Sequence, residues 1–125
     1  MYAVAVEREF IARHALGGDA PAAEQAPHAH AYRDECRVSG PRLDGQGYLV
    51  DLDRLAAALE AAIAGLRDRL LNELAEFRGV NPSLEHLARV VCARVRASGT
   101  VPEGCRLAVT AWESRQAWAS FAEDG

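Results

Sequence analysis

Two segments near the start of the chain alternate between apolar and polar residues. In positions 2–14 the even residues are mostly apolar, whereas the odd ones include Glu7 and Glu9. Successive side chains of a β-strand point to opposite faces, so this period of two is that of a strand with one buried face. Positions 28–40 alternate too, with the even positions facing inward apart from Asp34. The pattern predicts two half-buried strands.

Beyond the turn-rich stretch 40–47, apolar residues recur at intervals of three and four, the spacing of one helix face. The first stripe predicts a helix of about six turns. Its members are Leu52, Leu55, Leu59, Ile63, Leu66, Leu70 and Leu74. A second amphipathic helix follows, with Asn81 expected as its N-cap and Pro82 as its first helical residue. Its stripe consists of Leu84, Leu87, Val91 and Val95.

The end of the chain returns to alternation. Leu107, Val109 and Ala111 share one parity and predict a third strand, and positions 117–122 suggest a short fourth. The element order is then two strands, two helices and two strands. This grouping is typical of an α+β protein in which two helices back an antiparallel sheet. With 125 residues, the chain fits one domain, positions 1–125.

Composition narrows the classes of function. Fourteen basic and eighteen acidic residues give a net charge of -4, with no block of like charge that would follow a phosphate backbone. Nucleic acid is therefore not expected as a partner. No run approaches the roughly 20 apolar residues of a membrane span, and the first residues lack the basic start of a signal peptide. We expect a soluble, cytoplasmic protein without a membrane partner, whose three widely spaced cysteines are free thiols.

Three histidines share the inward parity of the first two predicted strands. His28 and His30 are two residues apart on one strand, and His14 lies on the inward face of the other. Three imidazoles are one of the ligand sets of catalytic zinc, which keeps its fourth position open. A lone His-x-His pair also arises by chance in an alanine-rich chain, so the spacing alone leaves both interpretations open. His86, in the second predicted helix, is interpreted as a partly exposed helical residue.

Glu113 has the parity of the apolar face of the third predicted strand. An unpaired buried carboxylate is costly, so either the strand ends before Glu113 and the residue is solvated, or the carboxylate pairs with donors. A flat heterocycle with adjacent N–H groups would suit it, because a carboxylate accepts two parallel hydrogen bonds.

Five motifs occur in an order that resembles a known family. They are FIARH at 10–14 for F-x-A-x-H, HAH at 28–30 for H-G-H, GYLVDL at 47–52 for G-x-V-x-D-F, NPSLEHLA at 81–88 for N-P-T-x-E-N-L-A, and ES at 113–114 for E-T. Together they resemble the family of 6-pyruvoyl-tetrahydropterin synthase and 6-carboxy-tetrahydropterin synthase, and the resemblance covers nearly the whole chain.

The resemblance implies a tunnelling fold (T-fold) that assembles as rings, typically a homo-hexamer of two trimers, with active sites at subunit contacts. It also implies a Zn²⁺ ion held by His14, His28 and His30, and a pterin-like substrate, 7,8-dihydroneopterin triphosphate, whose ring Glu113 anchors. Zinc would act as a Lewis acid on the side-chain hydroxyls of the substrate, so that a nearby base removes a carbon-bound proton.

The chain departs from the family pattern at the proton-transfer residues. Members carry a cysteine four residues before the first histidine of H-G-H, where this chain has Glu24, and an Asp-His pair where this chain has Arg67 and Asp68. A family variant with glutamate at the cysteine position is associated with cleaving the side chain to leave 6-hydroxymethyl-dihydropterin. Glu24 is therefore a candidate base, the alternative being an ordinary residue of a mobile loop. Asp68 is a weaker candidate, because its arginine neighbours indicate a solvated helical face.

These observations predict a zinc-dependent carbon–oxygen or carbon–carbon lyase of pterin metabolism. Two alternatives stay open. One is a homologue that keeps the zinc and the heterocycle pocket but has lost turnover, and serves as a binding or assembly subunit. The other is an enzyme with the same fold and metal but a changed substrate. The sequence contains no phosphate-binding loop of the G-x-x-x-x-G-K type, so phosphate contacts would have to come from scattered arginines.

Overall fold

The computed structural model describes residues 1–123, so the last two positions of the predicted domain lie outside the described residues. Its four strands form one antiparallel sheet in the order β1-β2-β3-β4. The strands are β1 (Tyr2–His14), β2 (His28–Gly40), β3 (Arg106–Trp112) and β4 (Trp118–Ala122). The two long helices are α2 (Leu52–Ala64) and α3 (Leu84–Ala97), and shorter ones are α1 (Ala22–Gln25), η1 (Leu71–Glu73) and η2 (Ala75–Phe77).

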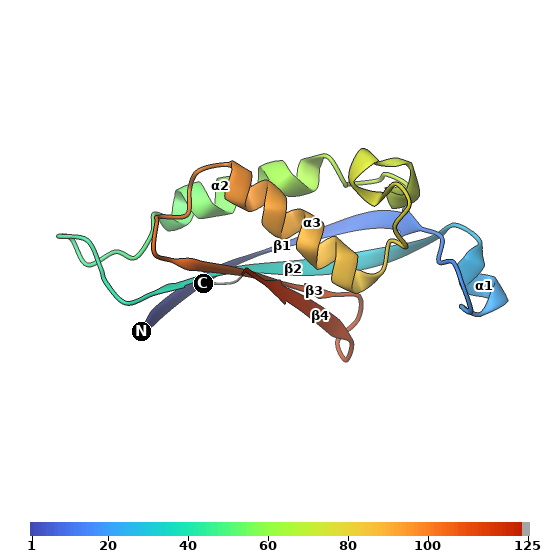
Figure 1. The fold of residues 1–125 in the computed structure, drawn as a ribbon, viewed down its shortest axis with the longest axis horizontal. Helices are drawn as coiled ribbons and strands as arrows, with labels where there is room; N and C mark the ends of the chain where they lie inside the picture. The colour runs from blue at the N-terminus through green and yellow to red at the C-terminus, as the bar shows by residue number, and fades with distance from the viewer. Residues whose placement is uncertain (124–125) are drawn as a thin grey trace.

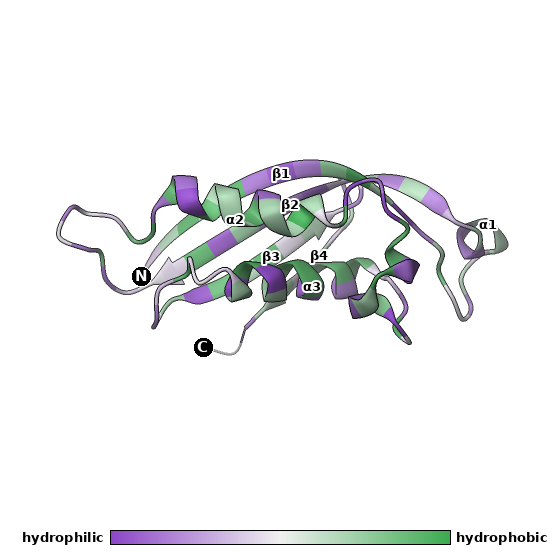
Figure 2. Cartoon of the chain, turned by 90° about the horizontal axis from the view of Figure 1, so that it is seen from above, coloured by the Kyte–Doolittle hydropathy of each residue, from purple (hydrophilic) through white to green (hydrophobic). Residues whose placement is uncertain are grey.

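Helices α2 and α3 contact each other and cover one face of the sheet, as Figure 1 shows from the side and Figure 2 from above. This arrangement confirms the predicted α+β class and the β-β-α-α-β-β order of the main elements. Within residues 1–123, no helix is both long and apolar enough to cross a membrane.

The core lies between this face of the sheet and the two helices. Val38 on β2 and Val109 on β3 are fully buried, as are Leu55 and Leu59 on α2 and Val91 on α3. Burying a side chain of this size contributes about 1.5–3 kcal/mol relative to leaving it exposed, so the alternation and the helical stripes drive the two layers together. The inward parity predicted for the strands is confirmed.

One residue of the inward face differs from the prediction. Asp34, expected as the exception to the buried parity of β2, points inward with the others and is 0% exposed. Its cross-strand partners are Arg8 on β1 and Ala111 on β3. Its carboxylate oxygens have no hydrogen-bond partner among the described residues, and burial raises the pKa of Asp34 to about 7.

Helix α2, which corresponds to the first predicted helix, is shorter than predicted. Its N-cap is Asp51, whose carboxylate accepts hydrogen bonds from the backbone N–H groups of Asp53 and Arg54, and it ends at Ala64. Gly65 follows, and Asp68 has a φ of 61°, in the left-handed region that interrupts a helix. The stripe leucines beyond Ala64 therefore lie in the turn after the helix, at the edge of β1 and between the two short 3₁₀ helices, not in further turns of α2.

The segment after α2 runs along the outer edge of β1. The N–H of Asp68 donates to the carbonyl of Ile11 (2.7 Å), and the N–H of Arg13 donates to the carbonyl of Arg69 (2.9 Å). These bonds hold the last residues of β1 and explain why the chain leaves the helix here. Asp68 is accordingly an exposed turn residue and not part of a helical face as predicted.

Helix α3 begins two residues later than predicted. Its N-cap is Ser83, whose hydroxyl accepts from the N–H of His86 at 3.2 Å. Asn81 instead uses its side-chain oxygen to accept from the N–H of Gly17 at 3.0 Å. Serine is as good an N-cap as asparagine, which is why the sequence pattern did not separate the two.

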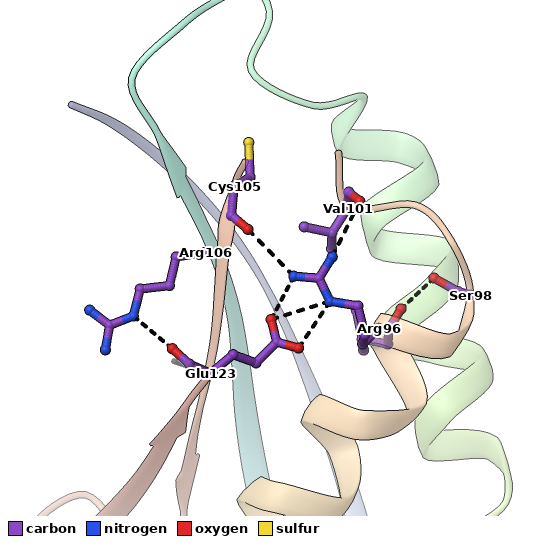
Figure 3. Close-up of polar contacts among 7 residues, drawn as sticks. Arg96, Ser98, Val101, Cys105, Arg106 and Glu123 are labelled. Atoms are coloured by element: carbon purple, nitrogen blue, oxygen red, sulfur yellow. Dashed lines mark hydrogen bonds and ion pairs between the residues drawn. The ribbon is translucent and has the colours of Figure 1, made fainter. Parts of the chain in front are cut away.

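An arginine at the end of α3 anchors the last strand. Figure 3 shows Arg96 paired with the carboxylate of Glu123, with Nε to Oε2 at 2.9 Å, and also donating to the carbonyl of Cys105 at 3.4 Å. The side chain of Arg106 donates to the carbonyl of Glu123 at 3.2 Å. These contacts fasten the end of the chain beyond β4 to the helix that covers the sheet.

Candidate metal centre

The three predicted histidines come together where β1 ends and β2 begins. His14 is the direct cross-strand partner of His28, and His30 lies one inward position further along β2. The ring centroids are 4.6 Å (His14–His28), 5.0 Å (His14–His30) and 4.9 Å (His28–His30) apart. One ring nitrogen from each histidine lies within 4.8 Å of the other two. The antiparallel register thus converts the inward parity of these residues into a cluster of three imidazoles.

Hydrogen bonds to backbone carbonyls locate the protons of two of these rings. Nδ1 of His14 lies 2.9 Å from the carbonyl oxygen of Pro82, and Nδ1 of His28 lies 2.9 Å from that of Ala26. A carbonyl only accepts, so each Nδ1 carries the proton and each Nε2 has a free lone pair. Both Nε2 atoms are buried and have no hydrogen-bond partner among the described residues.

Buried acceptors without partners are costly, and these two belong to neighbouring rings. A histidine that ligates a metal through one nitrogen usually donates its other N–H to a carbonyl or carboxylate. His14 and His28 both have this arrangement. The donor set therefore fits a metal ion such as zinc, for which neutral imidazole nitrogens are common ligands.

The electrostatic environment keeps His14 neutral. Its side chain is 3% exposed, and burial lowers its pKa below the ordinary value of 6.5. The bond to the Pro82 carbonyl raises the pKa, while the nearby rings of His28 and His30 lower it further. Near neutral pH the ring is in the unprotonated form that a metal requires.

Two asparagines that were not singled out from the sequence as site residues hold the loop after His14. Asn72 accepts from the N–H of Ala15 at 2.8 Å and donates to the Ala15 carbonyl at 2.9 Å, while Asn81 binds the N–H of Gly17. Because these bonds fix the backbone next to His14, they support the position of its ring. Asn81 opens the NPSLEHLA motif, which was the available signal for it.

Tyr32 was also missed, although it shares the inward parity of His28 and His30. Its hydroxyl lies 3.3 Å from Nδ1 of His14, and its ring stacks on Phe10 with centroids 5.3 Å apart. The side chain is 1% exposed. Burial raises the pKa of Tyr32, and the charge of Glu113 raises it further, so the residue is a neutral phenol near pH 7.

Glu113 lies just beyond β3 and close to these rings. The strand ends at Trp112, and the N–H of Glu113 donates to the carbonyl of Ala117 at 3.1 Å in the turn towards β4. The half-buried side chain lines an open pocket of about 540 Å³ and has no hydrogen-bond partner among residues 1–123. Its charge acts on the pKa of His14 and of Tyr32, which makes it an electrostatic neighbour of the cluster.

The two candidate bases do not join the cluster within the described chain. Glu24 is exposed on α1, in the long connection between β1 and β2, where its backbone carbonyl accepts from the N–H of Leu16 at 2.8 Å. Asp68 lines a different hollow, of about 620 Å³, together with Ile11 and Trp112. His86 is partly exposed on α3, as predicted, with Nδ1 2.6 Å from the carbonyl of Asn81.

The fold and the cluster together define a small α+β protein with a three-histidine candidate metal centre at one end of its sheet. The sequence profile of 6-pyruvoyl tetrahydropterin synthase matches residues 3–124. The chain therefore belongs to the 6-pyruvoyl tetrahydropterin synthase family, and its fold is the tunnelling fold predicted from the motifs. Among curated proteins, none matches the chain significantly by sequence.

Solved structures agree with this assignment of the fold. The 6-pyruvoyl tetrahydropterin synthase of Plasmodium vivax has a TM-score of 0.81 at 15% identity and covers 98% of both chains. That of Caenorhabditis elegans has a TM-score of 0.74 at 19% identity and covers 99% of this chain and 98% of its own. Two further structures of the Plasmodium vivax protein carry a catalytic glutamate replaced by alanine or by cysteine, each with a TM-score of 0.74 at 15% identity.

Proposed function

We propose that this protein is a zinc-dependent lyase of pterin metabolism, which processes the side chain of 7,8-dihydroneopterin triphosphate or a close relative. The observation that carries the proposal is the pair of buried Nε2 lone pairs on His14 and His28, whose protons are held on Nδ1 by backbone carbonyls. Membership of the 6-pyruvoyl tetrahydropterin synthase family supplies the class of substrate.

The metal site consists of His14, His28 and His30. When bound there, zinc supplies a Lewis acid that acidifies a substrate hydroxyl and so the adjacent C–H bond. Glu113 binds the heterocycle through two parallel N–H···O hydrogen bonds. The proximity of Glu113 to His14 supports this role, because the ring of one substrate must reach Glu113 while its side chain reaches the metal site.

Glu24 is the proposed base that removes the carbon-bound proton. It lies four residues before His28, in the connection that begins and ends at metal-site histidines. The Plasmodium vivax enzyme has a glutamate as a catalytic residue, which supports a carboxylate in this chemistry. General-base catalysis typically contributes 10²–10⁴-fold in rate. Asp68 is the second candidate for the same role.

The protein is proposed to act as a cytoplasmic homo-oligomer, a hexamer formed by two trimers. Both edges of the sheet support an assembly, because β4 pairs only with β3 within the described chain and β1 is covered from outside only near Arg13. Open edge strands pair readily with other copies, and head-to-tail pairing closes a ring. An active site at a subunit contact would also bring Glu24 or Asp68 of one subunit to the histidines of another.

The alternative is a homologue that keeps the metal and the heterocycle pocket but does not turn over this substrate, because it lacks activity or acts on another compound. The separation of Glu24 and Asp68 from the histidine cluster within the chain favours this possibility.

The test is the rate of conversion of 7,8-dihydroneopterin triphosphate by the zinc-loaded wild type and by Glu24→Gln, with products identified by mass spectrometry. The proposal predicts a fall of at least about a hundredfold with unchanged zinc content. Glu103→Gln, at another exposed glutamate, is the matched control. Equal rates in both variants would remove Glu24 from the mechanism, and a zinc-loaded wild type without any product would favour the alternative.

A further inference from the structure

The Nδ1 proton of His14 has two oxygen atoms within reach. One is the Pro82 carbonyl at 2.9 Å, and the other is the Tyr32 hydroxyl at 3.3 Å. Because the carbonyl fixes the proton on Nδ1, the hydroxyl oxygen can only accept from this nitrogen, through a weaker second branch of the same bond. Two acceptors, one in the loop before α3 and one on β2, therefore define the plane of the His14 ring.

The Tyr32 hydroxyl is itself held in place. Tyr32 is the cross-strand partner of Phe10, its ring stacks on the Phe10 ring at 5.3 Å between centroids, and its side chain is 1% exposed. The centroid of the His30 ring, two residues earlier on β2, lies 5.6 Å from that of the Tyr32 ring. A phenol packed in this way has little freedom to rotate, so its oxygen is a rigid reference point for His14.

We propose that Tyr32 is a positioning residue of the candidate metal centre: its hydroxyl holds the imidazole of His14 so that Nε2 points to the position where a metal binds. This inference rests on the proposed function, because it assigns Tyr32 a part in the same site. Pro82 acts through its backbone and tolerates side-chain changes in this respect, whereas Tyr32 contributes a side-chain hydroxyl that substitution can remove. Tyr32 therefore makes the arrangement testable.

The variant is Tyr32→Phe, which keeps the ring that packs on Phe10 and removes only the hydroxyl. Zinc affinity is measured for metal-free protein by competition with a chelator, and the absorption spectrum of the Co²⁺-substituted protein reports the ligand geometry. Loss of a partner that orients a metal ligand typically weakens binding tenfold to a hundredfold, so we expect at least about a tenfold loss and a changed Co²⁺ spectrum. Tyr48→Phe, which removes the hydroxyl of a tyrosine that is 61% exposed, should leave both unchanged.

A second readout does not need the metal. In ¹⁵N-labelled metal-free protein, the Nδ1–H of His14 should exchange faster with solvent in Tyr32→Phe than in the wild type, because one acceptor is lost. Faster exchange in Tyr32→Phe than in the wild type, combined with a wild type that binds no zinc, would overturn the proposed function and retain the positioning of His14. Equal zinc affinity, Co²⁺ spectrum and exchange rate in Tyr32→Phe and wild type would overturn the role of Tyr32, while zinc binding itself would still stand.

Discussion

The inward face of the sheet contains two places where buried polar atoms have no partner among residues 1–123. One is the histidine cluster where β1 ends and β2 begins, with Nε2 of His14 and His28, and the other is the carboxylate of Asp34 near the middle of β2. Both lie on the same strand face and both are hidden from solvent. They differ in what stands beside the unsatisfied atoms.

At the histidine cluster, backbone carbonyls hold the protons on Nδ1, so neighbouring lone pairs are left facing a shared space. A bound cation satisfies such an arrangement. Asp34 lies opposite Arg8 on β1 and Ala111 on β3, and the guanidinium of Arg8 is directed to Glu60 at 3.8 Å. Burial therefore raises the pKa of Asp34 to about 7, and a proton takes the place that a partner would fill. Several buried lone pairs that face one space indicate a binding site. A single buried carboxylate without a partner instead takes up a proton.

The largest expected effect comes from removing one member of the cluster. His28→Ala should lower zinc affinity by more than a hundredfold, because a lost ligand costs more than a lost outer partner, for which tenfold to a hundredfold is typical. Competition with a chelator gives the affinity. His86→Ala, a change of a histidine outside the cluster, is the control and should have no effect. Similar losses in both variants would mean that the three histidines are not the metal ligands.

The second effect separates Asp34 from the cluster by pH. Its pKa is 3.8 in the unfolded chain and about 7 in the fold, so the folded state binds more protons between these values and stability falls as pH rises through this window. Asp34→Asn lacks this loss. Its advantage in unfolding free energy over the wild type should grow by about 3 kcal/mol between pH 5 and pH 8, at 1.36 kcal/mol per pKa unit.

Urea unfolding of metal-free protein at the two pH values provides the measurement. Asp19→Asn, at an exposed position, should follow the wild type. If the wild type and Asp34→Asn kept a constant difference from pH 5 to pH 8, Asp34 would be ionised throughout and would have a partner.

The smallest expected effect concerns Arg8, the cross-strand partner of Asp34 on β1. Burial is the cause of the raised pKa of Asp34. The protein stops losing stability with rising pH near the pKa of Asp34 in the folded state. In Arg8→Gln this pH should therefore move by less than about half a unit. A rise of a full unit would show that Arg8 stabilises the carboxylate anion and that Asp34 is less isolated than described.

Most of the fold follows from local patterns in the sequence. The strand alternation predicted which residues of β1, β2 and β3 point inward, since one buried face imposes a period of two. The end of α2 was not predictable from the leucine stripe, because Leu66 and Leu74 of that stripe remain buried although the chain leaves the helix after Ala64. The path of this segment depends on hydrogen bonds of Asp68 and Arg69 to the edge of β1, which are contacts between distant parts of the chain.

The candidate site, like the fold, was predictable only in part. His14, His28 and His30 were identified by parity, and the register brings them together. Their tautomers depend on the carbonyls of Pro82 and Ala26, and a backbone carbonyl leaves no mark in the sequence. Asp34 shows the opposite limit: a carboxylate at a buried parity was expected to escape burial, yet the period of the strand placed it in the core.

The most direct test of the account is a zinc titration of the metal-free wild type and of the double variant His14→Ala/His28→Ala. The account predicts about one zinc per chain, and at a free zinc concentration of 100 times Kd the wild type should gain about 2.7 kcal/mol, or roughly 8–10 °C in Tm. The double variant should bind no zinc at this concentration and gain nothing. Absence of zinc binding by the wild type, or equal binding by the double variant, would contradict the assignment of a metal centre to these histidines.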